Sequence, residues 1–506
     1  MIVSKKFLIP KLVLLGALGS LAGCSSEDTV DSVTDSDSDS ESVETSVTYS
    51  YPIVDTNQGL CYDGTSRLDE CPAEGEAFYG QDAQYTATTP SYTDNGDGSI
   101  NDNVTGLVWT QAISTYAMPW SDAATYCGTL ETANLTSWRL PSLKELWSIR
   151  DFSQGVPWVD TDYFYLVGDG SDLAQHHSWS SDPYLVESPY QDEQVEGDPA
   201  WIVNDWTGHI KAMSGSRFVR CVIGDEYGVN DFVDNGDSTI TDNATGLMWM
   251  QDDSGEAMYW EDALAYAESA TIAGYDDWRL PSIKELQSIA DNSVTEIPAM
   301  DTSVFNLTEV ENIVYDPDTL EQIDTQVNYP FYWSNTSNPI EDDSEDVDGG
   351  TLYGWVYASG YNVSLLGYDL HGAGSIVFVS KTLENSGIED SVPILVRLVR
   401  GGDVTETPEG DSSTINLDRV VVFEDGIVSS GGGSDVAEEE STGLDFSIGV
   451  AYLESLEINV TSDELIVLIG GPPAPTAAEV VSNFAASSLT ITEDQVLELL
   501  ETLNLE

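Results

Sequence analysis

The feature that most constrains the fold is a nine-residue motif that occurs twice in the chain. It reads Trp-Arg-Leu-Pro-Ser-Leu-Lys-Glu-Leu from Trp138 and Trp-Arg-Leu-Pro-Ser-Ile-Lys-Glu-Leu from Trp278. The same spacing relates an Asp-Asn-Gly-Asp stretch at Asp94 to another at Asp234, and no gap is needed between these blocks. The chain is therefore a tandem repeat.

Each copy of the motif contains a helix start. Ser-x-x-Glu is a capping box, in which the Ser hydroxyl accepts from the Glu amide and the Glu carboxylate accepts from the Ser amide. We therefore expect helices that begin at Ser142 and Ser282, with Glu145 and Glu285 completing the caps. The proline before each serine favours an extended residue ahead of the helix.

The two residues that open the motif have expected structural roles. Trp138 and Trp278 are predicted core anchors, because they lie in apolar patterns. Arg139 and Arg279 are expected to bind backbone carbonyls or a buried carboxylate rather than a ligand. The other tryptophans of the first repeat expected in the core are Trp109, Trp120, Trp179 and Trp201.

The rest of each repeat predicts an α+β unit. Apolar residues at helical spacing from Trp120, and again from Trp260, indicate an amphipathic helix ahead of the motif. The remainder reads as short strands and turns, and about 130 residues are enough for one core. Matching 217–220 to 397–400 gives the second repeat about 40 extra residues in its late loops.

The first residues read as a bacterial lipoprotein signal. An apolar run, too short to span a bilayer permanently, closes on Leu-Ala-Gly-Cys ending at Cys24. This tetrapeptide resembles a lipobox, which implies a lipid anchor on Cys24 in the outer membrane, facing the cell surface or the periplasm. The alternative is an ordinary secretory signal with a chance cysteine. Residues 25–48 are acidic and polar and predict a disordered tether.

The four remaining cysteines are expected to form disulfides, because the set is even and the chain is exported. Cys61 and Cys71 are close in sequence and are expected to close an N-terminal loop, which leaves Cys127 to pair with Cys221. The second repeat has no cysteine, so it must hold the same fold without a disulfide.

These observations give a domain plan. It comprises a signal peptide at 1–24, a tether at 25–48, a first repeat with its N-terminal disulfide loop at 49–224, a second repeat at 225–403, a linker with one candidate strand at 404–442, and a small α-helical tail at 443–506. The tail is expected because two capping boxes, at Thr461 and Thr492, predict two small helix-turn-helix units.

The net charge of the chain excludes some classes of binding partner. The sequence has 16 Lys and Arg against 89 Asp and Glu, a formal net charge of −73. Nucleic acid, anionic lipid and sulfated polysaccharide would each meet like charge, so none is expected as an electrostatic partner. Solubility in salt explains this acidity better than a dedicated acidic binding face.

The Asp-Asn-Gly-Asp loops have two interpretations. In a calcium-loop register the twelfth positions would be Val104 and Ala244, so the bidentate carboxylate is missing. Asn-Gly between extended residues predicts a hairpin turn, which we favour. If the loops bind a metal instead, calcium is the expected ion, and the ligands are Asp94, Asp97, Asp102, Asp234, Asp237 and Asp242.

One further stretch has side chains suited to a sugar. Asn204, Asp205 and Trp206 place an amide, a carboxylate and an indole side by side. The histidines, at 176, 177, 209 and 371, have no metal-ligand spacing and are expected in surface loops. With no Gly-x-Ser-x-Gly elbow and no spare thiol, no catalytic residue is assigned, and an enzyme is not expected.

Taken together, the blocks Asn-Gly-Asp, Thr-Gly-Leu-x-Trp, Trp-x-Asp-Ala, Trp-Arg-Leu-Pro-Ser-x-Lys-Glu-Leu and Val-Arg resemble the bacterial DUF1566 family, the C-terminal domain of the Legionella collagen-like adhesin. The resemblance covers residues 92–222 and 232–401. It implies two tandem C-type-lectin-like domains, similar to formylglycine-generating enzymes. A disulfide from Cys127 on the first helix to Cys221 on the last strand agrees with that fold.

The resemblance also implies a role in adhesion. We expect a cell-envelope lipoprotein whose tandem lectin-like domains bind a glycan or a surface protein. One alternative is a structural or assembly component of the envelope without a small ligand. A remote alternative is an enzyme of the formylglycine-generating type.

Overall fold

The structure is a computed structural model. It describes residues 49–153, 155–166, 177–188, 198–315, 322–340, 352–362, 369, 371–382, 393–407, 420–422 and 428–430. The predicted signal peptide, tether and helical tail lie outside these residues. In the part of the chain that is described, no helix has the length and apolarity needed to span a bilayer.

Each repeat opens with three short antiparallel strands, to which a strand from the end of the repeat is added. In the first repeat these are β2 (Tyr92–Asp94), β3 (Ser99–Asp102), β4 (Val108–Thr110) and β10 (Val222–Ile223). In the second they are β11 (Phe232–Asp234), β12 (Thr239–Asp242), β13 (Leu247–Met250) and β20 (Val399–Gly401). Gly96 and Gly236 have φ of 70° and 74°, which an Asn-Gly hairpin turn requires. The predicted hairpins are confirmed.

Two helices per repeat lie where the sequence predicts them. The amphipathic helices are α1 (Trp120–Gly128) and α3 (Trp260–Glu268). The motif helices are α2 (Leu143–Ser148) and α4 (Ile283–Ser288), and each has the complete capping box at its start. Two short 3-10 turns, η1 (Asp82–Gln84) and η2 (Thr132–Asn134), complete the helical structure of the described residues. The α+β class predicted from the sequence fits this mixture, in which strands predominate.

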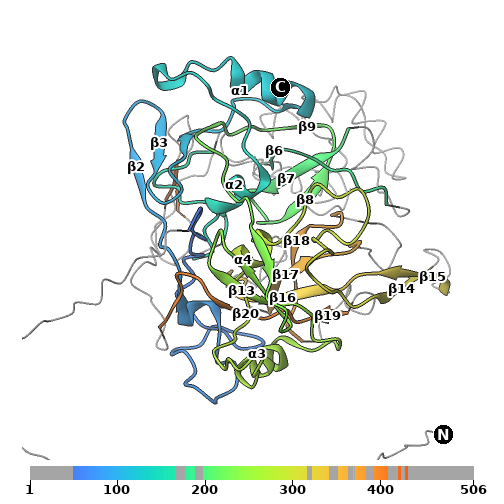
Figure 1. Cartoon of the computed structure of the whole chain (residues 1–506). Helices are drawn as coiled ribbons and strands as arrows, with labels where there is room; N and C mark the ends of the chain where they lie inside the picture. The colour runs from blue at the N-terminus through green and yellow to red at the C-terminus, as the bar shows by residue number, and fades with distance from the viewer. Residues whose placement is uncertain are drawn as a thin grey trace, which may run out of the picture. The chain divides into compact units, whose positions relative to one another are not determined.

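One seven-stranded sheet runs through both repeats (Figure 1). Its strands, in spatial order, are β19 (Ile394–Leu395), β16 (Phe331–Ser337), β17 (Tyr353–Ala358), β18 (Ile376–Ser380), β8 (Ile210–Met213), β7 (Ala200–Asn204) and β6 (His177–Pro183). β18 of the second repeat pairs with β8 of the first through Ile376 and Ile210. The amide of Ala212 also donates to the carbonyl of His371 at 2.8 Å. Each half-sheet therefore covers the open edge of the other.

The remaining strands form two-stranded ribbons. These pairs are β1 (Tyr85–Thr86) with β21 (Thr405–Glu406), β5 (Met118–Pro119) with β9 (Ser216–Arg217), β14 (Val310–Tyr315) with β15 (Gln322–Asn328), and β22 (Val420–Val422) with β23 (Val428–Ser430). The candidate strand in the linker thus includes β22.

The buried side chains form three clusters, and the largest belongs to both repeats. One smaller cluster surrounds the disulfide of the first repeat and the other surrounds Trp260 of the second. The largest joins Phe152 and Trp158 to Trp355, with ring centroids 5.4 and 5.0 Å from that of Trp355. The expectation of one core per repeat was therefore incomplete, because the largest buried cluster is shared by both repeats.

The N-terminal segment, residues 49–88, contacts the first repeat near Asp151 and Phe152, but its disulfide loop and strand β1 lie against the second repeat. The Gln58 side chain donates to the carbonyl of Ser337 at 2.7 Å and accepts from its amide at 2.8 Å, as a neighbouring strand would. The Phe78 ring lies 6.1 Å from that of Trp260. Strand β1 pairs with β21, which follows the second repeat.

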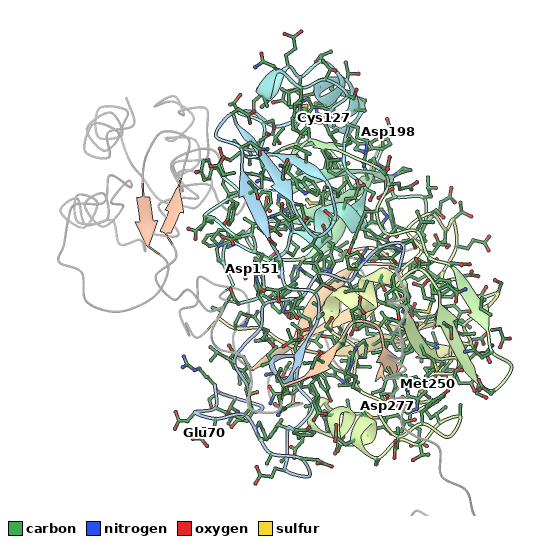
Figure 2. All side chains as sticks on the ribbon, turned by 60° about the vertical axis from the view of Figure 1, so that its left-hand side comes forward. Glu70, Cys127, Asp151, Asp198, Met250 and Asp277 are labelled. Atoms are coloured by element: carbon green, nitrogen blue, oxygen red, sulfur yellow. A yellow bond between two sulfur atoms is a disulfide. The ribbon has the colours of Figure 1, made fainter. Side chains whose placement is uncertain are left out.

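This position corrects the domain plan, which assigned the disulfide loop to the first repeat. Glu70, inside that loop, lies at the same end of the molecule as Asp277 of the second repeat, with Cys127 of the first repeat at the opposite end (Figure 2). Adjacency in sequence suggested the wrong neighbour. The loop lies against the second repeat because it buries apolar surface there. Trp260, which this segment covers, is 0% exposed, whereas the equivalent Trp120 in the first repeat is only partly buried.

Both predicted disulfides are confirmed. Cys61 is bonded to Cys71, and Cys127 on α1 is bonded to Cys221 just before β10. The second repeat has Ala267 and a leucine at the positions of the latter pair, and both are buried in its own apolar cluster. Apolar packing there takes the place of the covalent bond.

The strand register corrects the alignment of the last strand. Val222 lies opposite the tryptophan of β4, and Val399 lies opposite the tryptophan of β13. Arg220 therefore corresponds to Arg397, not to Arg400. The alignment erred because each copy has closely spaced arginines in this stretch, and the wrong ones were paired. The extra length of the second repeat is accordingly slightly smaller than the sequence comparison suggested.

Candidate functional site

The capping boxes of the motif each carry an ion pair, which confirms the predicted role of the arginines. The Glu145 carboxylate accepts from the Ser142 amide at 2.8 Å and from two nitrogens of Arg139 at 2.6 and 2.7 Å. Glu285, Ser282 and Arg279 repeat the arrangement at 2.6 to 2.8 Å. Trp138 and Trp278 are buried beside them, as predicted. These residues are structural.

The lysine of each motif contacts the helix of the other repeat, which the sequence did not predict. Lys144 Nζ donates to the carbonyl of Ser288 at 2.6 Å, and Lys284 Nζ donates to the carbonyl of Ser148 at 3.0 Å. A cation is favourable at a helix C-terminus, where carbonyls lack partners. Burial lowers the pKa of both lysines to about 8. We use "seam" for this junction, formed by α2, α4, β8 and β18.

The candidate calcium ligands hold turns. Asp94 accepts from the amide of Gly96 at 2.7 Å, and Asp97 accepts from that of Ser99 at 3.1 Å. Asp102 accepts from the amide of Val104 at 2.9 Å. In the second repeat, Asp234 and Asp242 accept from the amides of Gly236 and Ala244, and Asp237 accepts from the hydroxyl of Thr239. Among the described residues, no three His, Cys, Asp or Glu side chains are grouped to hold a metal ion.

The candidate sugar-binding stretch is mostly inside the protein, so most of these side chains are not available to a sugar. Asn204 and Asp205 are 3% and 1% exposed, and only Trp206 is partly accessible. Asp205 forms an ion pair with the buried Arg150 and accepts from Ser178 at 3.2 Å. Asn204 Oδ1 accepts from the amides of Trp206 and Thr207, so the amide and the carboxylate are both engaged inside the protein and do not face a ligand.

The described histidines are buried or only partly exposed. His177 is buried at the start of β6, and His176 lies outside the described residues. The rings of His209 and His371 meet across the seam with centroids 5.1 Å apart. Burial lowers the pKa of both rings, that of His371 to about 3. His209 and His371 lie in loops, as expected, but these loops come from different repeats and pack together, so both rings are only partly exposed.

The first repeat has an open cavity of about 530 Å³ beside its disulfide. Strand β4, the loop after it and helix α1 form the walls. The lining residues are Gly98, Thr110, Gln111, Ala112, Ile113, Ser114, Thr115, Tyr126, Leu130, Thr132, Tyr165, Val219 and Cys221. None of them is charged, although the chain has 89 acidic residues. This volume is in the range of small-ligand sites.

A second cavity, of about 410 Å³, lies between the N-terminal segment and the second repeat and has the opposite character. Its walls include Glu74, Glu268 and Glu406. Burial, together with the charges of Glu406 and Glu74, raises the pKa of Glu268. An anionic ligand would meet like charge here. The two cavities are therefore not equivalent, although the repeats are.

The fold and these sites define a class of protein: a tandem α+β repeat, fused at a shared sheet, with a cavity but no assigned catalytic group. The family model of the Lcl C-terminal domain matches residues 98–223 and 238–368. These two stretches together make up just over half of the chain. The chain belongs to the Lcl C-terminal domain family, with two copies of the domain. None of the curated proteins matches it.

Proposed function

We propose that this protein is a lipid-anchored lipoprotein of the outer membrane that binds a neutral glycan in the cavity of its first repeat and so contributes to adhesion. The uncharged lining of that cavity is the observation that carries the proposal. An acidic chain repels anionic ligands, whereas a neutral sugar meets no such cost. Membership in the Lcl C-terminal domain family is consistent with an adhesion-like surface protein.

The side chains around the cavity suit a sugar. Tyr126 and Tyr165 are partly exposed and offer aromatic faces to C–H groups. Gln111 and Thr132, also partly exposed, add amide and hydroxyl groups for hydrogen bonds. Few polar groups on an otherwise apolar wall are typical of small-ligand sites.

The finer fold assignment, a C-type-lectin-like domain, is part of this proposal. A disulfide between the first helix and the last strand supports it. A cofactor is not required by the proposed site, and calcium remains a candidate only through the Asp loops.

Binding of the soluble 49–506 fragment to an array of neutral glycans, at high salt, with and without EDTA, tests the proposal. We expect saturable binding that Tyr126→Ala weakens at least tenfold, which is about 1.4 kcal/mol. Tyr266→Ala, at the equivalent place in the second repeat, is the matched control and should bind normally. Loss of binding in EDTA would restore the Asp loops as ligands.

If no glycan binds in either condition, the glycan proposal is wrong. The alternative, a structural or assembly component of the envelope, would then account for the fold. Copurification of a stable protein complex would support it.

A further inference from the structure

Lys144 on α2 is connected by hydrogen bonds to two side chains of the second repeat, Asn230 and Asp242. Lys144 Nζ donates to Asn230 Oδ1 at 2.6 Å, and Asn230 Nδ2 donates to Asp242 Oδ2 at 2.9 Å. Asn230 Nδ2 also donates to the hydroxyl of Tyr51 at 3.0 Å. This network fixes the carboxamide with its oxygen towards the lysine, because the reverse orientation would set N–H groups against the ammonium.

Lys144 Nζ donates to three acceptors, Asn230 Oδ1, Ser288 O and Gly228 O, which suit the ammonium, whereas burial favours the neutral amine. Asp242 is 0% exposed, and the aromatic rings of Tyr51 and Tyr227 pack edge to face, 4.9 Å apart, beside it. Burial lowers the pKa of Lys144 to about 8. The lowered pKa gives Lys144 a larger neutral fraction than an ordinary lysine has at the same pH, and a neutral amine is a nucleophile.

The distance suits attack on the carboxamide carbon. A C=O bond is about 1.2 Å long, so Lys144 Nζ lies no more than about 3.8 Å from Asn230 Cγ. Reacting atoms in a productive arrangement are about 3 to 3.5 Å apart. A small side-chain movement therefore brings the two atoms into reach.

We propose that Lys144 and Asn230 join in an intramolecular isopeptide bond, with Asp242 as the proton carrier. The Nζ lone pair forms a bond to Cγ, and the C=O electron pair moves onto Oδ1. A proton passes from Nζ to the Asp242 carboxylate and on to Nδ2. The Cγ–Nδ2 bond then breaks, the C=O bond forms again, and ammonia leaves. The step needs no oxidant, reductant or co-reactant.

The second motif shows what the same lysine does without the amide. Lys284 Nζ also caps a helix of the other repeat and donates to the carbonyl of Asp55 at 2.8 Å. Pro90 occupies the position in the first repeat that Asn230 occupies in the second, so no carboxamide faces Lys284 from there. The matching carboxylate oxygen, Asp102 Oδ2, is buried without a hydrogen-bond partner among the described residues. Helix capping alone therefore does not require Asn230.

The bond would join the first repeat to the second. It links α2 to a residue 86 positions further along, just before β11. Closing a loop of that length restricts the unfolded chain. The seam would then be held covalently as well as by its sheet and core.

Intact-mass measurement of the reduced and alkylated full chain tests the proposal, followed by peptide mapping. We expect a loss of about 17 Da, the mass of ammonia. Mapping should yield a branched peptide that connects Lys144 to Asn230. The bond should form faster at pH 9 than at pH 7, since more of the amine is neutral.

Two variants separate this reaction from ring closure of Asn230 on its own backbone, which also releases ammonia. Lys144→Arg keeps a cation at the helix end and should abolish the mass loss, whereas backbone ring closure would persist in it. Lys284→Arg is the matched control and should keep the loss. Full mass in the wild type, with a Lys144 amine that can be acetylated after denaturation, would overturn the proposal without any variant.

Discussion

Glu145 and Glu285 occupy equivalent places in the two repeats, yet their arginine partners differ in exposure. The Arg139 side chain is 36% exposed, whereas that of Arg279 is 6% exposed. Water can solvate Arg139 if its carboxylate is removed, but it has little access to Arg279. A buried charge without its partner is strongly destabilising.

We therefore predict different costs for the same substitution. Glu285→Ala should lower the free energy of unfolding by about 3–5 kcal/mol, because it leaves the buried guanidinium of Arg279 without its carboxylate. Glu145→Ala should cost about 1–3 kcal/mol, mainly through the lost helix cap and hydrogen bonds. Urea denaturation of both variants measures the difference, and equal costs would contradict this account of burial.

At the scale of elements, local patterns in the sequence predicted local structure. The Ser-x-x-Glu pairs located both motif helices, and the Asn-Gly dipeptides located both hairpins. These signals act between residues that are close in the chain, so one copy of the sequence is enough to read them.

Contacts between elements that are distant in the sequence could not be predicted from such local patterns. The sequence analysis assigned no role to Lys144 or Lys284, and only the fold shows that each reaches the opposite helix. The cavity near Tyr126 depends equally on segments that the sequence separates. The sequence did contain one indication of the lysine contacts, because a lysine at the same place in both copies of the motif suggests a shared role.

The N-terminal segment gives a prediction at this scale. Gln58→Ala removes two hydrogen bonds to the backbone of Ser337, which then has a buried amide and carbonyl without partners. We expect the second repeat to lose about 1–3 kcal/mol of local stability. Hydrogen exchange without denaturant reports local opening, so exchange at β16 should rise there while that at β7 of the first repeat changes less. Unchanged exchange at β16 would show that the segment does not support this strand.

At the scale of the whole molecule, the two copies are not independently folded domains joined by a linker. β8 and β18 pair across the seam, the lysines cap each other's helices, and the largest buried cluster draws on both repeats. Separating the repeats would expose that cluster and open a sheet edge. Fusion also explains how the second repeat holds its fold without a disulfide.

The most direct test of this fusion perturbs one repeat and observes the other. Replacing Cys127 and Cys221 by serine removes the disulfide of the first repeat, with an expected cost of about 2–5 kcal/mol. Hydrogen exchange of the full chain in mild denaturant then reports on each repeat. We predict that amides of α4 and β17, in the second repeat, lose as much protection as those of α2 and β7. Loss confined to the first repeat would contradict the claim that the two copies fold as one unit.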